Sequence, residues 1–139
     1  MTPQICLVKH DPPHSYGDCF RACVASILDL PTDDVPHFYH DGVDGDVGTE
    51  RVREFLNGLG YTIVWFAFDG EALPLDEMLN IWGQMNPDVP AILLASNRDS
   101  DHAVVMRGDK IVHDPSWIRS SITGPNSNGY WNILVIAVK

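Results

Sequence analysis

Cys19 is the residue whose type and position are best suited to covalent chemistry. A cysteine attacks a carbonyl group as its thiolate, whereas an ordinary thiol, with a pKa near 8.5, is mostly protonated at neutral pH. Cys19 directly follows Asp18, a typical helix N-cap, and opens an apolar stretch with helical spacing. The N–H groups and the positive dipole end of a helix N-terminus favour the thiolate. Cys19 is therefore a candidate nucleophile, and the alternative is a small buried hydrophobic side chain.

The other two cysteines are predicted to be structural. Cys23 lies one turn further into the same helix, among apolar neighbours, where the influence of the N-terminus is mostly lost. Cys6 lies in a short apolar stretch that resembles a strand. An odd and small number of cysteines does not suggest a disulfide framework, so a reducing, cytoplasmic location is expected.

His102 and Asp114 are the candidates for the base and its orienting group, which a cysteine nucleophile requires within hydrogen-bond reach. His102 begins a predicted strand, and Asp114 ends the next one. The turn signal Gly108-Asp109 between the strands predicts a tight hairpin. The hairpin places the start of the first strand beside the end of the second, with Cβ atoms about 4.5–5.5 Å apart if the two residues are directly paired.

His113 is the competing histidine, but it is adjacent to Asp114 and would face the other side of a strand. A His-Asp doublet also occurs in metal-dependent phosphohydrolases, where it lies on a helix with further histidines around it. The strand-end context Val112-His113-Asp114-Pro115 favours the cysteine chemistry instead.

Two clusters that suggest a metal site do not have suitable spacing. The loop acids Asp41, Asp44 and Asp46 do not follow the calcium-loop pattern and lack a closing glutamate. A zinc site built from His37, His40, Cys19 and Cys23 would need ligand spacings that are irregular for zinc. No metal ion and no cofactor is expected.

The elements that must position these residues follow from the apolar patterning. Three helices are predicted, over residues 19–30, after an N-cap at Thr49, and over residues 74–85. Strands are predicted over residues 5–8, 61–67, 91–95, 102–107, 110–114 and 130–138, with loops at 37–48 and 115–129. Helices come first and antiparallel strands come last, which is an α+β arrangement in a single domain over residues 1–139.

The composition narrows the choice of partners. The formal net charge is -10, with only nine Lys and Arg residues. A protein that binds phosphates needs clustered basic residues, so neither a nucleic acid nor an anionic membrane surface is an expected partner. The chain shows no apolar stretch as long as a membrane span, and its first residues do not have the pattern of a signal peptide.

Three segments carry a family resemblance. GDCFRACVAS resembles the nucleophile helix of the papain-like cysteine peptidase clan, and especially of the C39-like peptidases, in which Asp-Cys opens the first helix. SDHAVVM and KIVHDP resemble that family's His strand and its Asp-Pro strand, in the same order along the chain. The chain is also similar to small phage and bacterial proteins with segments like GDCFRAC, LPTDDVPHF and VHDPSW. The resemblance covers residues 14–38 and 90–118.

The resemblance implies a papain-like fold, with the Cys helix packed on a small antiparallel sheet. It implies a cysteine hydrolase of the peptidase or amidase type, or an acyltransferase on the same scaffold. Cys19 would be the nucleophile, His102 the base and Asp114 the orienting group. The substrate would be a peptide, a protein or another amide, and no cofactor is implied.

The resemblance also bears on the groups around the nucleophile. The family usually has a glutamine shortly before the cysteine as an oxyanion donor, but Pro13 stands there in this chain. The second donor would then be His14 or His10, or would be missing. Tyr16 and Trp117 are candidates for lining the substrate site, and core packing is the alternative for Trp117. A second reading is a catalytically lapsed domain that binds a partner protein, for instance a phage protein that inhibits a host factor.

Overall fold

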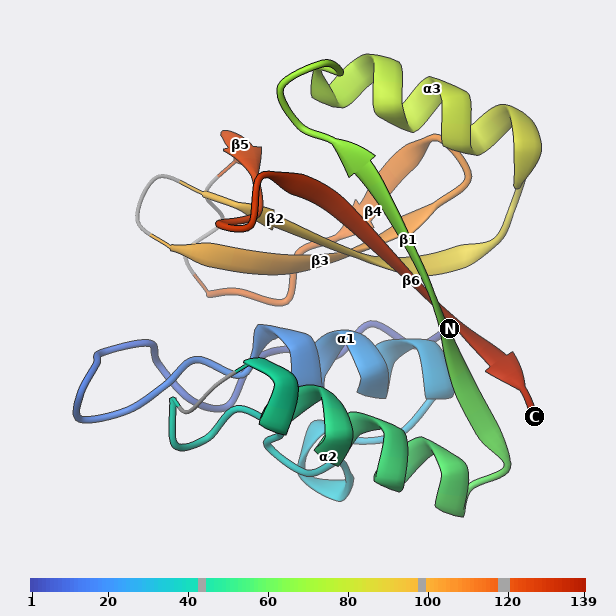
Figure 1. Ribbon diagram of the computed structural model, residues 1–139. Helices are drawn as coiled ribbons and strands as arrows, with labels where there is room; N and C mark the ends of the chain where they lie inside the picture. The colour runs from blue at the N-terminus through green and yellow to red at the C-terminus, as the bar shows by residue number, and fades with distance from the viewer. Residues whose placement is uncertain (43–44, 98–99, 118–120) are drawn as a thin grey trace. The chain divides into compact units, whose positions relative to one another are not determined.

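The computed structural model describes residues 1–42, 45–97, 100–117 and 121–139 and has an α+β architecture (Figure 1). The chain divides into two compact units. Unit 1 comprises Met1–Val64, Pro115–Trp117 and Ile136–Lys139, and unit 2 comprises Trp65–Asp114 and Ile118–Val135. The single domain expected for residues 1–139 stays a prediction.

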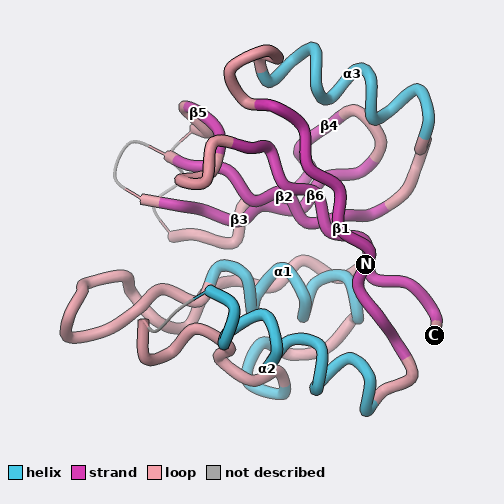
Figure 2. The backbone as a smooth tube through the Cα atoms, viewed as in Figure 1, coloured by secondary structure: helices cyan, strands magenta, loops and turns pink. Residues whose placement is uncertain are grey.

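Unit 1 contains the helices α1 (Cys19–Leu28) and α2 (Gly45–Gly58) and the short 3-10 helix η1 (Thr32–Asp34) (Figures 1 and 2). The ring of Phe38 bridges the two longer helices. Its centroid lies 6.1 Å from that of Phe20 on α1 and 5.8 Å from that of Phe55 on α2. Phe38 is almost completely buried, so this aromatic cluster fixes α1 against α2.

Helix α1 begins at the predicted residue and ends two residues earlier than predicted. Asp29 adopts a left-handed backbone conformation, with φ 58°, and the N–H of Leu30 donates to the carbonyl oxygen of Ala25. This is a common way to end a helix. The helix is therefore closed by the conformation of Asp29, before the chain reaches Pro31.

The prediction of a loop over residues 37–48 is wrong for its last part, because α2 begins at Gly45 and not after Thr49. The hydroxyl of Thr49 donates to the carbonyl oxygen of Gly45, 2.8 Å away, so Thr49 lies inside the first turns. The ring of Tyr39 packs on Gly48, where a Cβ atom would lie 2.0 Å from the ring. This packing favours a helix on a glycine-rich stretch that local propensity assigns to a loop.

Unit 2 is built on an antiparallel sheet with the strand order β1-β6-β2-β3-β4, in which β5 pairs with β2. The strands are β1 (Tyr61–Asp69), β2 (Pro90–Ser96), β3 (Asp101–Arg107), β4 (Lys110–His113), β5 (Gly124–Pro125) and β6 (Tyr130–Val138). β1 begins in unit 1 and β6 ends there. All the predicted strands from residue 61 onward are present, and β5 lies within the segment expected to be a loop. The strand predicted over residues 5–8 is absent.

Helix α3 (Leu75–Met85) covers one face of this sheet (Figure 1). Met78 and Trp82 of α3 form the core of unit 2 with the central strands, and Leu75 and Leu79 pack against this core, whereas Met85 at the end of the helix is 77% exposed. The core comprises Met78 and Trp82 of α3, Ala91, Leu93 and Ala95 of β2, Val104 and Met106 of β3, and Trp131 and Ile133 of β6. The sheet that carries His102 is thus held rigid by a continuous apolar layer. None of the helices in the described parts of the chain is long and apolar enough to cross a membrane.

Candidate functional site

Cys19 is the first residue of α1 and is partly exposed. Asp18 occupies the N-cap position, as predicted, but its side chain makes no capping hydrogen bond. Its carboxylate instead accepts the backbone N–H groups of Leu7 and Val8, each at 3.1 Å, and lies 3.4 Å from the guanidinium of Arg21. Asp18 is 1% exposed, so a buried carboxylate holds the N-terminal segment against the start of the helix.

Further hydrogen bonds hold residues 2–8 along unit 1. The N–H of Gln4 donates to the hydroxyl of Ser26, and the hydroxyl of Thr32 donates to the carbonyl oxygen of Ile5, both at 2.9 Å. The N–H of Cys6 donates to the carbonyl oxygen of Pro115, also at 2.9 Å. These bonds satisfy the backbone of an extended segment that has no strand partner, which explains why the predicted strand is absent.

This arrangement brings Cys6 into contact with Cys19. The two Sγ atoms lie 3.3 Å apart, and the thiol of Cys6 donates a hydrogen bond to Cys19. Neither residue is in a disulfide bond, and Cys6 is 3% exposed. The hydrogen bond to Cys19, followed by burial and by the charges of Cys19, Asp18 and Cys23, raises the pKa of Cys6 far above its ordinary range. Cys6 therefore stays a thiol and can stabilise negative charge on the Cys19 sulfur.

The raised pKa of Cys6 predicts a loss of stability at alkaline pH. Above the ordinary pKa of a thiol the unfolded chain releases the Cys6 proton and the folded chain keeps it, so stability falls as pH rises. We expect this residue to contribute a slope of about -1.4 kcal/mol per pH unit to the free energy of unfolding. Urea unfolding of wild type and Cys6→Ala between pH 8 and pH 10.5 measures this (roughly the window in which unfolded thiols ionise). Equal slopes above pH 9 would contradict the assignment.

Cys23 is completely buried in α1, which confirms the prediction of a packing role. The contact between Cys6 and Cys19 was not predicted. Twelve residues lie between them, and no motif signals that an irregular segment returns to the start of the helix. The hydrogen bonds made by Asp18, Ser26, Thr32 and Pro115 place Cys6 there.

His102 and Asp114 form a close pair in unit 2. Nε2 of His102 lies 2.9 Å from Oδ1 of Asp114, and the two side chains are 4% and 18% exposed. His102 lies on β3, opposite Ala95 of β2, and the small alanine side chain leaves room for an imidazole ring. The predicted partnership of the two residues is therefore confirmed as a contact.

A β-bulge makes this contact possible. At the hairpin turn Arg107 pairs with Lys110 and Met106 with Ile111, but Val105 pairs with His113, which leaves Val112 as the extra residue. In an unbroken register Asp114 would stand opposite Ala103, on the face away from His102, because neighbouring residues alternate between faces. The bulge shifts the register by one residue and carries Asp114 to the face of His102.

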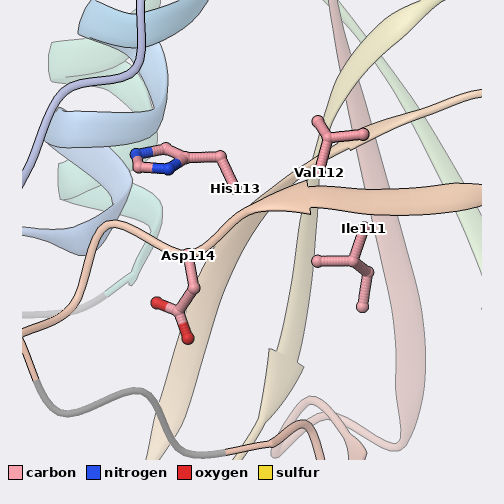
Figure 3. Close-up of a pocket in the computed structure, with 4 residues that line it drawn as sticks. All are labelled: Ile111, Val112, His113 and Asp114. Carbon is pink, nitrogen blue, oxygen red and sulfur yellow. The ribbon is translucent and has the colours of Figure 1, made fainter.

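Figure 3 shows the consequence for β4. The side chains of Val112 and His113 point to one side of the strand, and those of Ile111 and Asp114 point to the other. Two consecutive side chains on one side are typical of a bulge. His113 and Asp114 face opposite ways, as the sequence predicted, and all four residues line a hollow of about 290 Å³.

Insertion of one alanine between His113 and Asp114 tests the role of the register. The insertion moves Asp114 opposite Ala103, on the face away from His102, so we expect its bond to His102 to be lost. Long-range ¹⁵N–¹H NMR correlations of the His102 ring, which report its protonated nitrogen, measure the change. Val112→Ala keeps the register and is the control. Identical ring spectra in the wild type and the insertion variant would contradict this account.

The contact between His102 and Asp114 determines which ring nitrogen of the imidazole carries the proton. A carboxylate accepts a hydrogen bond and cannot donate one, so Asp114 favours the ring form with the proton on Nε2. In that form Nδ1 carries the lone pair that can take a proton from a thiol. Cys19 belongs to unit 1, and the pair of His102 and Asp114 belongs to unit 2.

The structure separates the two candidate oxyanion donors. His14 is exposed, and its N–H donates to the carbonyl oxygen of Asp11 in a tight turn. His10 is also exposed, and its Nδ1 accepts the N–H of Gly17, two residues before Cys19, at 3.1 Å. That bond leaves the ring proton of a neutral His10 on Nε2, where it can donate. The ring of His10 is therefore hydrogen-bonded to the segment that precedes Cys19.

The two predicted substrate-lining residues lie in unit 1. Tyr16 is partly buried, with its ring centroid 6.2 Å from that of His10, and its carbonyl oxygen lies 2.7 Å from Nε2 of His37. Gly42 packs directly against the Tyr16 ring. Trp117 is 57% exposed, which argues against the alternative of core packing.

The acidic loop has a structural partner. Asp41 binds Arg51 of α2 through two bonds of 2.9 and 3.0 Å, and Asp44 lies outside the described residues. Across the described ranges, no group of three or more His, Cys, Asp or Glu residues is arranged to hold a metal ion.

No family model, curated protein or solved structure matches this chain.

Proposed function

We propose that this protein is a papain-like cysteine hydrolase that acts through Cys19, His102 and Asp114. The observation that carries the proposal is the buried contact between His102 and Asp114, which a β-bulge is required to create. The position of Cys19 at the start of α1, with a thiol hydrogen bond from Cys6, supports it further. The order of the three segments and their resemblance to the C39-like peptidases agree with this reading.

The proposed reaction is acyl transfer to sulfur. Nδ1 of His102 takes the proton of Cys19, and the thiolate attacks the substrate carbonyl to form a C–S bond. The protonated imidazole then gives its proton to the leaving group as the bond to that group breaks. Water, deprotonated by the same histidine, resolves the acyl-enzyme and releases the acid. Asp114 keeps the ring oriented and stabilises its positive charge throughout.

The oxyanion of the tetrahedral intermediate needs hydrogen-bond donors. The backbone N–H of Cys19 at the helix N-terminus is one, and Nε2–H of His10 is the proposed second. The substrate class is a peptide, a protein or another amide or thioester. An amine in place of water would make the same site an acyltransferase.

A second candidate is a domain that has lost catalysis and binds a partner protein. Pro13 stands where the family usually has its glutamine donor, and this observation favours the second candidate. Removing one oxyanion donor typically costs a factor of about 10²–10³ in rate. A weak or absent turnover with an intact fold would support binding as the function.

An activated ester tests the hydrolase directly. With p-nitrophenyl acetate we expect a burst of one equivalent of nitrophenolate, an acetyl group mapped to Cys19, and continued turnover after the burst. Cys19→Ala should lose the burst and the turnover, whereas Cys23→Ala, in the same helix, should keep both. A wild-type protein that is acetylated on Cys19 without further turnover would contradict hydrolysis through this triad.

A further inference from the structure

The sulfur atoms of Cys6 and Cys19 lie in contact at the start of α1. Cys6 and Cys19 are not joined by a disulfide bond, and their Sγ atoms lie 3.3 Å apart. A disulfide bond is about 2.05 Å long, so the sulfurs must approach by little more than 1 Å to form one. We propose that Cys6 is the resolving cysteine of Cys19, so that a peroxide converts the pair into a reversible disulfide that protects and silences the nucleophile.

The two cysteines differ in the way that such a reaction requires. Cys19 is partly exposed and lies at a helix N-terminus, where thiolate character is favoured, so it is the sulfur that a peroxide reaches first. Cys6 is 3% exposed and is shielded from direct oxidation. Its backbone is held on both sides, by the bond from its own N–H to Pro115 and by the bonds from Leu7 and Val8 to Asp18. Cys6 thus stays within reach of Cys19.

The chemistry balances with a peroxide as the oxidant. The Cys19 thiolate attacks one peroxide oxygen, the O–O bond breaks, and hydroxide leaves, which gives a sulfenic acid on Cys19. Cys6 then loses its proton, its sulfur attacks the Cys19 sulfur, and the S–O bond breaks with release of water. Two thiols lose two electrons in total, and hydrogen peroxide is reduced to two molecules of water.

The first step also prepares the second. The hydrogen bond to Cys19 is the largest cause of the raised pKa of Cys6, and the negative charge of Cys19 adds to it. Oxidation to a neutral sulfenic acid removes that charge, so Cys6 becomes easier to ionise only after Cys19 has been oxidised. The buried thiol of Cys6 therefore stays protonated and unreactive until Cys19 has been oxidised. Cys23 is completely buried inside α1, and it is the matched control.

The test treats the folded protein with one equivalent of hydrogen peroxide and counts free thiols after denaturation. Wild type should fall from three free thiols to one, become two hydrogen atoms lighter, and yield a peptide linked through Cys6 and Cys19. Dithiothreitol should restore all three thiols. Cys23→Ser should form the same link, whereas Cys6→Ser should instead stop at a sulfenic acid on Cys19, which a second equivalent of peroxide converts to sulfinic acid.

The outcome does not depend on catalysis, because thiol counts and peptide maps need no substrate. Sulfinic acid on wild-type Cys19 with Cys6 still free would overturn the proposal, and so would a link between Cys19 and Cys23. The wild-type map alone decides the question if Cys6→Ser does not fold. A failed ester assay with a formed disulfide would refute the hydrolase and leave this inference standing.

Discussion

His102→Ala is expected to abolish the low-pH reactivity of Cys19 and to reduce ester turnover by about 10²–10⁴-fold. In the proposed wild-type pair the imidazolium keeps Cys19 ionised, so its alkylation by iodoacetamide should vary little between about pH 5 and pH 8. Without the histidine the thiolate fraction should rise about tenfold per pH unit below the thiol pKa. Alkylation rates at each pH, with peptide mapping to Cys19, measure the difference.

His113→Ala is the matched control for this substitution. The two histidines belong to neighbouring strands of one hairpin, but His113 pairs with Val105 and faces the side of the sheet away from His102. We expect its alkylation profile to match that of the wild type. A flat wild-type profile that is lost in His113→Ala and kept in His102→Ala would show that the base has been assigned to the wrong histidine. Identical profiles in all three proteins would exclude an ion pair with either.

Asp114→Asn is expected to reduce ester turnover by about 10³–10⁴-fold with little loss of folded protein. An asparagine amide has nearly the same shape but can donate a hydrogen bond to Nε2 of His102, which moves the ring proton to Nδ1. The nitrogen that should take the Cys19 proton is then already protonated, and the histidine no longer acts as a base. Ester turnover and the ring ¹⁵N spectrum of His102 should change together.

Asp109→Asn provides the control for loss of one negative charge. Asp109 is exposed in the turn of the same hairpin, so its charge is replaced without touching His102. Turnover in this variant should equal that of the wild type. If Asp114→Asn kept the wild-type ring spectrum and rate, Asp114 would not orient the base.

The hairpin of β3 and β4 shows which structural features the local sequence pattern can predict. The alternation of apolar residues and the Gly108-Asp109 turn indicate β3 and β4, and these signals are local because turn chemistry and strand period depend on neighbouring residues. The pairing of His102 with Asp114 was also expected, but a regular two-residue hairpin would place Asp114 on the wrong face. The bulge at Val112 brings Asp114 to the face of His102, and no residue type in this segment signals a bulge.

The start of α2 is a feature that the local sequence pattern could not predict. Gly45 and Gly48 favour a loop locally, and the helix forms there because Tyr39 packs onto the space that Gly48 leaves. Such packing brings together residues from different segments of the chain. Helix propensities are properties of single residues, so they cannot predict it.

The amino-acid sequence by itself determined the α+β class, the strands from residue 61 onward, the helix that begins at Cys19, and the choice of His102 and Asp114 as partners. Each of these rests on local periodicity, caps and turns, which act over a few residues. Only the tertiary structure decided which face Asp114 occupies and that Cys6 contacts Cys19. Both depend on where distant backbone groups find hydrogen-bond partners, because a folded chain must satisfy every buried polar group.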